Sequence, residues 1–199
     1  ATLSVRPAPF GDDDLVAIYA GSHGVANGLD AVIAAANELR RRGDLRVKFL
    51  CVGDGSQKQS LRQSVIDAGL EDRVVFLEPV GKSELAGLIQ GADVGIQCLA
   101  NVEAFYEGTS PNKFFDYVAS GKPVLVNYPG WVRDLILEDD CGWAVDPDDP
   151  AGFADALQEA AASREETLER GERALLLAHR RFDRAVLSET FSNWVTLGK

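Results

Sequence analysis

Residues 107–121 read EGTSPNKFFDYVASG, and this stretch decides how the rest of the chain is interpreted. It begins as a loop and becomes a helix, because Ser110 is a favourable N-cap and Pro111 suits the first helical position. Gly121 can adopt the left-handed backbone conformation that ends a helix. Apolar residues recur at helical spacing and predict one buried face: Phe114, Tyr117 and Val118.

The opposite face of this predicted helix carries polar residues one turn apart: Asn112, Lys113 and Asp116. The start of a helix offers free backbone N–H groups and the positive end of the helix dipole, which together with Lys113 suit a phosphate or diphosphate. Asp116 lies one turn deeper, where a carboxylate can accept hydrogen bonds from a pair of sugar hydroxyls. The stretch therefore predicts a nucleotide site.

The composition narrows the possible classes of protein. The chain has 199 residues, of which 46% are hydrophobic, so one sizeable folded domain is expected. A net charge of −11 disfavours nucleic acid and an anionic membrane surface as partners. No apolar run approaches the roughly 20 residues of a membrane-spanning helix, and the first ten residues lack a signal-peptide pattern. Cys51, Cys98 and Cys141 lie far apart, which is typical of reduced thiols in a cytoplasmic protein.

Strands and helices are predicted to alternate along the chain. Apolar runs predict strands at 15–20, 47–52, 74–77, 93–99, 123–127 and 142–145, and helical patterns fill the segments between them and continue over 150–162, 164–181 and 182–197. Asn27 with Asp30, and Ser56 with Gln59, have the spacing of capping boxes at the starts of the first two helices. The second helix is expected to bury its apolar residues: Leu61, Val65 and Ile66. A longer loop is expected between the fourth strand and the Ser110 helix.

This alternation predicts a three-layer, Rossmann-like α/β domain with about six parallel strands and helices on both faces. Residues 1–14 are predicted to be a linker or tail, 15–181 the domain itself, and 182–199 a separate last helix. The loops at Gly21, at Gly53, after Leu77 and before Ser110 all follow carboxyl ends of strands. Ligands of parallel sheets bind beyond those ends, so these four loops are expected to form one cleft.

Five blocks, in this order, resemble the donor-binding half of the group 1 retaining glycosyltransferases, enzymes with two Rossmann-like domains facing across a cleft. The blocks are YAGSHGVANGLD (19–30), LCVGDGSQKQSL (50–61), RVVFLEPVGKSELAGLIQGADVGI (73–96), YEGTSPNKFFDYVASGKPVLV (106–126) and GWAVDPDDP (142–150). The SPNKFFDY form is most similar to the bacterial subgroup that transfers amino sugars in surface polysaccharide synthesis. The resemblance implies a UDP-sugar donor, with residues 15–181 binding it and 182–199 forming a crossover helix.

The resemblance also implies roles for individual residues. Asp116 matches the acidic residue that holds the ribose hydroxyls, and Glu107 matches the one that faces the sugar, although one residue more than usual separates the two. The loop and helix start that hold the diphosphate and the sugar correspond to Thr109, Ser110, Pro111, Asn112 and Lys113. The exit around Pro79 and Val80 corresponds to the place of the uracil ring.

The loop after the first strand departs from the family pattern. Ser22 and Asn27 stand where the family usually has an arginine and a lysine for the diphosphate, so more of that task falls on Lys113 and on backbone amides. Gly21 and Gly24 still allow close approach of the backbone. His23, between these two glycines, is expected to be either a donor-binding residue of the cleft or an exposed polar residue of the loop.

These observations predict the donor half of a retaining glycosyltransferase in bacterial polysaccharide or glycolipid synthesis, inactive by itself. Glu107 and Lys113 are the expected catalytic residues, and no metal or other cofactor is expected. The expected partners are the nucleotide-sugar and an N-terminal acceptor domain, through which any contact with the inner face of the membrane would occur. Two alternatives stay open: an epimerase of UDP-N-acetylglucosamine type, with His23 and Glu107 as acid and base, and a non-catalytic α/β interaction module. The glycine spacing disfavours a nicotinamide-dependent enzyme.

Overall fold

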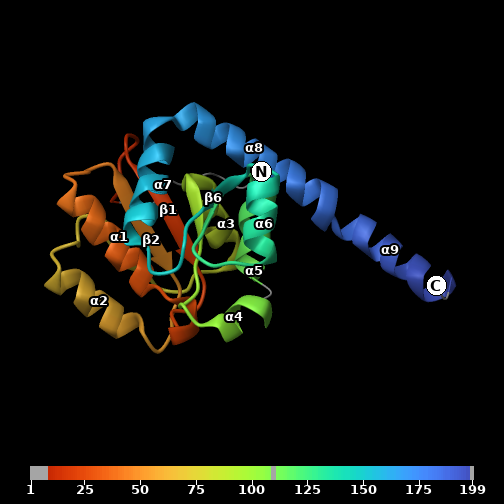
Figure 1. The fold of residues 1–199 in the computed structure, drawn as a ribbon, viewed down its shortest axis with the longest axis horizontal. Coiled ribbons are helices and arrows are strands. Elements are labelled where there is room, and N and C mark those ends of the chain that lie inside the picture. The colour runs from red at the N-terminus through yellow and green to blue at the C-terminus, as the bar shows by residue number, and fades with distance from the viewer. Residues whose placement is uncertain (1–8, 109–110, 198–199) are drawn as a thin grey trace.

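The computed structural model describes residues 9–108 and 111–197 (Figure 1). Within these residues the strands are β1 (Leu15–Ala20), β2 (Val47–Val52), β3 (Val74–Leu77), β4 (Val94–Gln97), β5 (Val124–Val126) and β6 (Gly142–Ala144). The α-helices of the described part are α1 (Asp30–Arg41), α2 (Lys58–Asp67), α3 (Lys82–Gly91), α4 (Glu103–Gly108), α5 (Asn112–Ala119), α6 (Trp131–Glu138), α7 (Pro150–Ala162), α8 (Arg164–Phe182) and α9 (Arg184–Leu197).

The strands form one six-stranded sheet in the order β3-β2-β1-β4-β5-β6, and every pair of neighbouring strands is parallel. The predicted α/β fold is therefore confirmed. The strand order reverses between β1 and β4, and in sheets of this kind the crevice at that reversal opens at the carboxyl ends of the strands. Those ends carry the loops that the sequence analysis singled out, so the fold brings them to one edge of the sheet.

Helices cover both faces of the sheet, because the strands alternate their side chains between two apolar cores. Along β1, Leu15, Ala17 and Tyr19 pack in one core with residues of α1, α2 and α7. The residues between them pack in the second core, with residues of α3, α5, α6 and α8. Every residue of β1 is buried. The apolar runs that predicted strands are thus the interior of a three-layer domain.

The two ends of the described chain differ in their contacts with the domain. Phe10, in the segment predicted to be a linker or tail, is buried in the second core. Arg164 at the start of α8 donates to the backbone oxygens of Asp12 and Asp14, at 3.2 Å and 2.5 Å, which holds the turn before β1 against the domain. At the other end, α9 projects away from the domain (Figure 1). The last helix begins at Arg184, and Phe182 belongs to α8.

The two predicted capping boxes are wrong, and tertiary contacts explain why. Asn27 ends a short 3-10 turn, Val25–Asn27, because Ala26 accepts from the backbone N–H of Ala100 at 3.0 Å, which draws this turn toward the end of β4. The helix then begins at Asp30. Ser56 does not cap α2, because the backbone N–H of Gln57 donates to the carbonyl of His23 at 2.9 Å and α2 begins one residue later.

Three smaller predictions also differ from the structure. Ile66 is exposed, because α2 turns the face of Leu61 and Val65 toward the core and Ile66 lies beside that face. The segment expected to be a longer loop contains α4. Pro111 is the residue before the first turn of α5, which begins at Asn112. The predicted cap Ser110 lies outside the described residues.

Candidate functional site

Lys113 lies at the start of α5 and reaches over the carboxyl end of β1. Its ammonium nitrogen lies 5.0 Å from the centroid of the Tyr19 ring and 3.5 Å from the Asn27 amide oxygen. Its side chain passes so close to Gly21 that a Cβ atom there would lie 3.0 Å from Lys113 Cε, and Gly21 has φ +155°. The fold therefore brings the lysine of the EGTSPNKFFDYVASG stretch onto the glycine loop after β1, as the nucleotide-site prediction requires.

The Lys113 ammonium is half-buried, and its surroundings bear on what it can bind. No carboxylate of the described residues lies within ion-pair distance of it. The Cys98 thiol nearby is neutral at ordinary pH, since burial raises its pKa to about 12. Burial lowers the pKa of Lys113, which means that its surroundings disfavour the charge. A partly desolvated cation beside exposed backbone is suited to an anion, and a phosphate would supply the missing charge.

The loop after β1 is held in place by two tyrosines. The Tyr19 hydroxyl donates to the carbonyl of Ser22 at 2.7 Å, and the Tyr117 hydroxyl accepts from the backbone N–H of Ala20 at 2.9 Å. Tyr117 lies on α5, one turn beyond Lys113, and its ring is fully buried. The same helix that carries Lys113 therefore also fixes the end of β1, so the lysine and the loop beneath it are positioned together.

Asp116 lies on the exposed side of α5, one turn after Lys113. Burial raises the pKa of this carboxyl, and the charge of Lys82 at the start of α3 opposes that shift. Lys82 follows the loop that contains Pro79, which is exposed, and Val80, which is partly buried against the second core. Asp116 and the exit of β3 thus lie on the same side of the molecule, with Lys82 between their elements.

The structure describes the other predicted site residues to different extents. Ser22 and Asn112 are exposed, Gly24 is partly exposed, and Pro111 is buried. Glu107 belongs to α4, but its side chain lies outside the described part, as do Thr109 and Ser110 entirely. Their predicted roles toward the sugar and the diphosphate stay predictions.

His23 is fully buried, so the expectation of an exposed loop residue is wrong. Its ring packs against the rings of Tyr19 and Phe76, with centroid distances of 5.9 Å and 5.6 Å. The imidazole therefore has no contact with solvent. The predicted role as a donor-binding residue stays a prediction, and an indirect contribution fits this position better than a direct contact.

Sequence reasoning missed Tyr19, Tyr117 and Lys58 as residues that shape this edge of the sheet. The Lys58 ammonium is buried and donates to the carbonyls of Gly53 at 2.8 Å and Leu77 at 3.1 Å, which joins the ends of β2 and β3. One signal could have found it. A lysine at the start of a helix is unfavourable toward the helix dipole, and it therefore indicates a specific partner.

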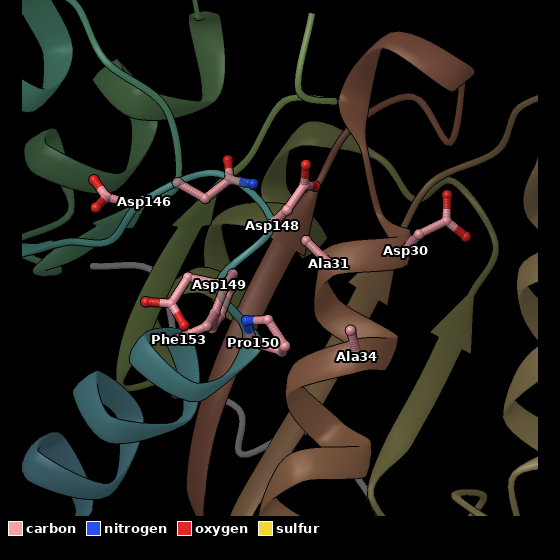
Figure 2. A pocket seen from close by; sticks show the side chains of 9 residues that line it. Asp30, Ala31, Ala34, Asp146, Asp148, Asp149, Pro150 and Phe153 are labelled. Atoms are coloured by element: carbon pink, nitrogen blue, oxygen red, sulfur yellow. The ribbon is translucent and has the colours of Figure 1, made fainter.

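A separate cavity of about 280 Å³ opens on the same edge of the sheet, between α1 and α7 (Figure 2). Asp30, Ala31 and Ala34 line it from α1, and the loop into α7 adds Asp148 and Asp149. Asp149 accepts from the backbone N–H of Gly152 and so caps α7. A wall this rich in carboxylates disfavours a diphosphate, so the cavity is distinct from the predicted nucleotide site.

A family model described as "Glycosyl transferases group 1" matches residues 14–163. The chain belongs to this family. A D-inositol 3-phosphate glycosyltransferase of Paenarthrobacter aurescens is 30% identical over 158 residues, which are 78% of this chain and 36% of that protein. A GDP-mannose-dependent alpha-(1-6)-phosphatidylinositol monomannoside mannosyltransferase of Mycobacterium tuberculosis is 27% identical over 145 residues, 72% of this chain and 37% of that protein. The group 1 chain thus spans about a third of the length of the curated relatives it matches.

Solved structures share the fold of this group 1 domain. Anabaena HepE in complex with UDP matches 92% of this chain and 49% of its own, with a TM-score of 0.79 and 18% identity. The C-terminal domain of the group 1 protein LpcC from Francisella tularensis matches 86% of this chain and 87% of its own, with a TM-score of 0.70 and 18% identity. These matches show that this domain shares its fold with both structures.

Two further observations concern metals and membranes. The described residues contain no group of three or more His, Cys, Asp and Glu side chains placed to hold a metal ion. The prediction of a metal-independent reaction nevertheless stays a prediction. Across residues 9–108 and 111–197, the structure has no helix of the length and apolar character needed to span a bilayer.

Proposed function

We propose that this group 1 domain binds the UDP-sugar donor of a retaining, metal-independent glycosyltransferase of bacterial polysaccharide or glycolipid synthesis. The observation that carries the proposal is the Lys113 ammonium, which lies half-buried over the loop of Gly21 and has no carboxylate partner among the described side chains. The family membership supports a nucleotide-sugar donor over the epimerase and the interaction module, and the UDP complexes of HepE support UDP.

In the proposed reaction, the bond between the sugar and the diphosphate breaks and the sugar passes to an acceptor hydroxyl with its configuration retained. Negative charge grows on the departing diphosphate. Lys113 and the free N–H groups at the start of α5 would stabilise that charge, which is the kind of electrostatic assistance that lowers a barrier most. We assign Asp116 to the ribose hydroxyls, Glu107 to the sugar, and the loop around Pro79 and Val80 to the base.

We further propose that an N-terminal domain supplies the acceptor site and that the enzyme acts in the cytoplasm, with membrane contact only through that domain. The projecting helix α9 supports this assignment. Phe191 and Trp194 on α9 are 64% and 63% exposed, and together with Val195 they form an exposed apolar surface. Such surfaces are typical of contacts with another domain or protein. Nucleic acid is not proposed as a partner, because the chain carries a net charge of −11.

The first prediction tests the proposal directly. The purified chain is expected to bind UDP weakly in calorimetry, with a dissociation constant several-fold lower than that for GDP and unchanged by EDTA. It is expected to transfer no sugar from a panel of UDP-sugars to lipid-diphosphate or saccharide acceptors, because two facing domains are needed to orient the reactants and exclude water.

The outcomes of this experiment separate the parts of the proposal. A preference for GDP would overturn the assignment of the base, and an effect of EDTA would overturn metal independence. Turnover at an ordinary enzymatic rate, roughly 1–1000 per second, would show that the chain is not merely one half of an enzyme. Conversion of a UDP-sugar into its epimer without an acceptor would favour the epimerase.

A second prediction concerns Asp116. Asp116→Asn is expected to weaken UDP binding about fivefold, because a typical hydrogen bond is worth about 1 kcal/mol and the amide accepts with only one oxygen. The loss with 2′-deoxy-UDP should be smaller, since one of the two hydroxyls is already absent. Glu71→Gln is the matched control, because Glu71 is exposed in the turn before β3, at the far end of the sheet. Equal losses for both ligands would indicate a structural role for Asp116.

A further inference from the structure

The proposed reaction gives no role to the buried imidazole of His23. None of its surface is exposed, and neither ring nitrogen has a hydrogen-bond partner of good geometry among the described residues. The Val52 carbonyl lies near the ring, and it also accepts from the backbone N–H of Gly21 at 2.9 Å. A buried polar ring without partners costs folding free energy, so its presence at this edge of the sheet calls for an explanation.

The backbone around His23 joins two loops. The His23 N–H donates to the carbonyl of Asp54 at 2.8 Å, and the His23 carbonyl accepts from the N–H of Gln57 at 2.9 Å. With the bond from Gly21 to Val52, these contacts continue the pairing of β1 and β2 beyond the ends of both strands. His23 therefore lies at the joint between the loop that carries Gly21 and the turn that begins α2.

The loop that carries Gly21 and the turn that begins α2 pack against each other without free space. A Cβ atom on Gly55 would lie 2.6 Å from the His23 carbonyl carbon, and one on Gly53 would lie 1.9 Å from the Gly21 oxygen and 3.3 Å from His23 Nε2. The His23 ring also packs against Tyr19, and the Lys113 ammonium lies 5.0 Å from the centroid of the same ring. Two contacts thus connect His23 to the cation of the nucleotide site through a single aromatic ring.

We propose that His23 is a positioning residue whose neutral imidazole holds Tyr19 and the loops after β1 and β2 in the arrangement that presents Lys113 and the Gly21 backbone to the donor. Protonation of the ring loosens this joint and weakens donor binding. The effect on donor binding rests on the proposed function, because it assumes that the donor binds beside Lys113.

The charged groups around His23 set the direction of this effect. Burial disfavours the protonated ring most, and the Lys58 ammonium adds to that, whereas Asp54 and Glu78 favour the proton. Tyr19 is neutral, because burial raises the pKa of its hydroxyl far above the ordinary value. The pKa of His23 is lowered overall, so the folded protein holds the ring neutral at pH 7. The unfolded chain takes up the proton first as the pH falls below about 6.5, and stability is lost from there down to the folded pKa.

The experiment uses the fact that the chain contains two histidines. In NMR titrations, His23 is expected to take up its proton at a lower pH in the folded chain than in the unfolded chain. His179, the second histidine, is exposed on α8. His23→Phe keeps a ring in place but cannot take a proton. Its unfolding equilibrium is therefore expected to change less steeply with pH than that of the wild type, by up to tenfold per pH unit below about 6.5. His179→Gln should behave like the wild type.

Measurements of UDP binding test the second part of the proposal, that protonation of His23 weakens donor binding. The dissociation constant for UDP is expected to rise at least threefold more in the wild type than in His23→Phe when the pH is lowered through the folded pKa of His23. The comparison cancels the titration of UDP itself. If His23→Phe does not fold, His23→Gln serves instead. Equal pH profiles of UDP affinity in wild type and variant overturn the proposal. If UDP binds neither protein, the proposed function fails. The pH dependence of unfolding in wild type and His23→Phe still decides whether neutral His23 holds the two loops together.

Discussion

Lys113→Met is expected to weaken UDP binding by at least tenfold and to leave the domain as stable as before, or more stable. Hydrogen bonds to charged groups contribute roughly 1.5–3 kcal/mol each, and every 1.4 kcal/mol is tenfold in affinity. Because Ser22 and Asn27 stand where the resemblance implies two cations, Lys113 carries this charge alone at the start of α5. The affinity is measured by calorimetry and the stability by urea unfolding.

The expected stability follows from the surroundings of the lysine. Methionine keeps the apolar stem that passes Gly21 and lies on the Tyr19 ring, but it has no ammonium. Burial lowers the pKa of Lys113, so the folded state disfavours its charge, and removing that charge removes a cost. A gain in stability together with a loss of binding is typical of a residue kept for function.

The matched control is Lys48→Ala, which changes the net charge by the same unit. Lys48 lies in β2 and donates to the carbonyl of Asp72, near the amino end of β3 and away from the site. A similar loss of UDP affinity in both variants would indicate a general effect of charge. An unchanged dissociation constant in Lys113→Met would overturn the assignment of the diphosphate to this lysine.

Gly95→Ala is expected to reduce the free energy of unfolding by about 3 kcal/mol or more. A Cβ atom on Gly95, in the middle of the sheet, would lie 2.5 Å from two ring carbons of Tyr117. The Tyr117 ring is fully buried, and its hydroxyl accepts from the Ala20 N–H, so it cannot move without leaving that group unpaired. Overpacking a core costs roughly 1–3 kcal/mol, and an unpaired buried donor about 1–3 kcal/mol more.

Urea unfolding of four proteins measures this effect: wild type, Gly95→Ala, Tyr117→Leu and the double variant. The smaller leucine leaves room for the new methyl group, so the two losses should add to clearly more than the loss in the double variant. Gly81→Ala is the control, since Gly81 has φ −65° and nothing lies near its missing Cβ. Its free energy of unfolding should stay within about 1 kcal/mol of the wild type, because Gly81 is the N-cap of α3 and alanine is less favourable there. A strictly additive double variant would show that Tyr117 does not require the glycine.

Both predictions depend on α5, whose main features follow from local sequence. The spacing of Phe114, Tyr117 and Val118 predicted the buried face, and Gly121, with φ +65°, ends the helix region as expected. The bounds of β1, β2, β3 and α7 agree with the predicted ranges. These features could be predicted because apolar periodicity, prolines and glycines act over a few neighbouring residues. The parallel three-layer fold follows from the alternation of strands and helices.

The tertiary structure decided what lies between residues far apart in the chain. It set the strand order, it overrode the predicted capping by Asn27 and Ser56, and it buried His23 under the turn before α2. The hydrogen bond from the Ala20 N–H to Tyr117 spans 97 residues, and the contact between Lys113 and Asn27 spans 86. Local patterns carry no information on such pairs, because they exist only once the sheet brings the carboxyl ends of its strands together. The sequence therefore identified the lysine, and the tertiary structure brought it beside the glycine loop, with no carboxylate partner among the described side chains.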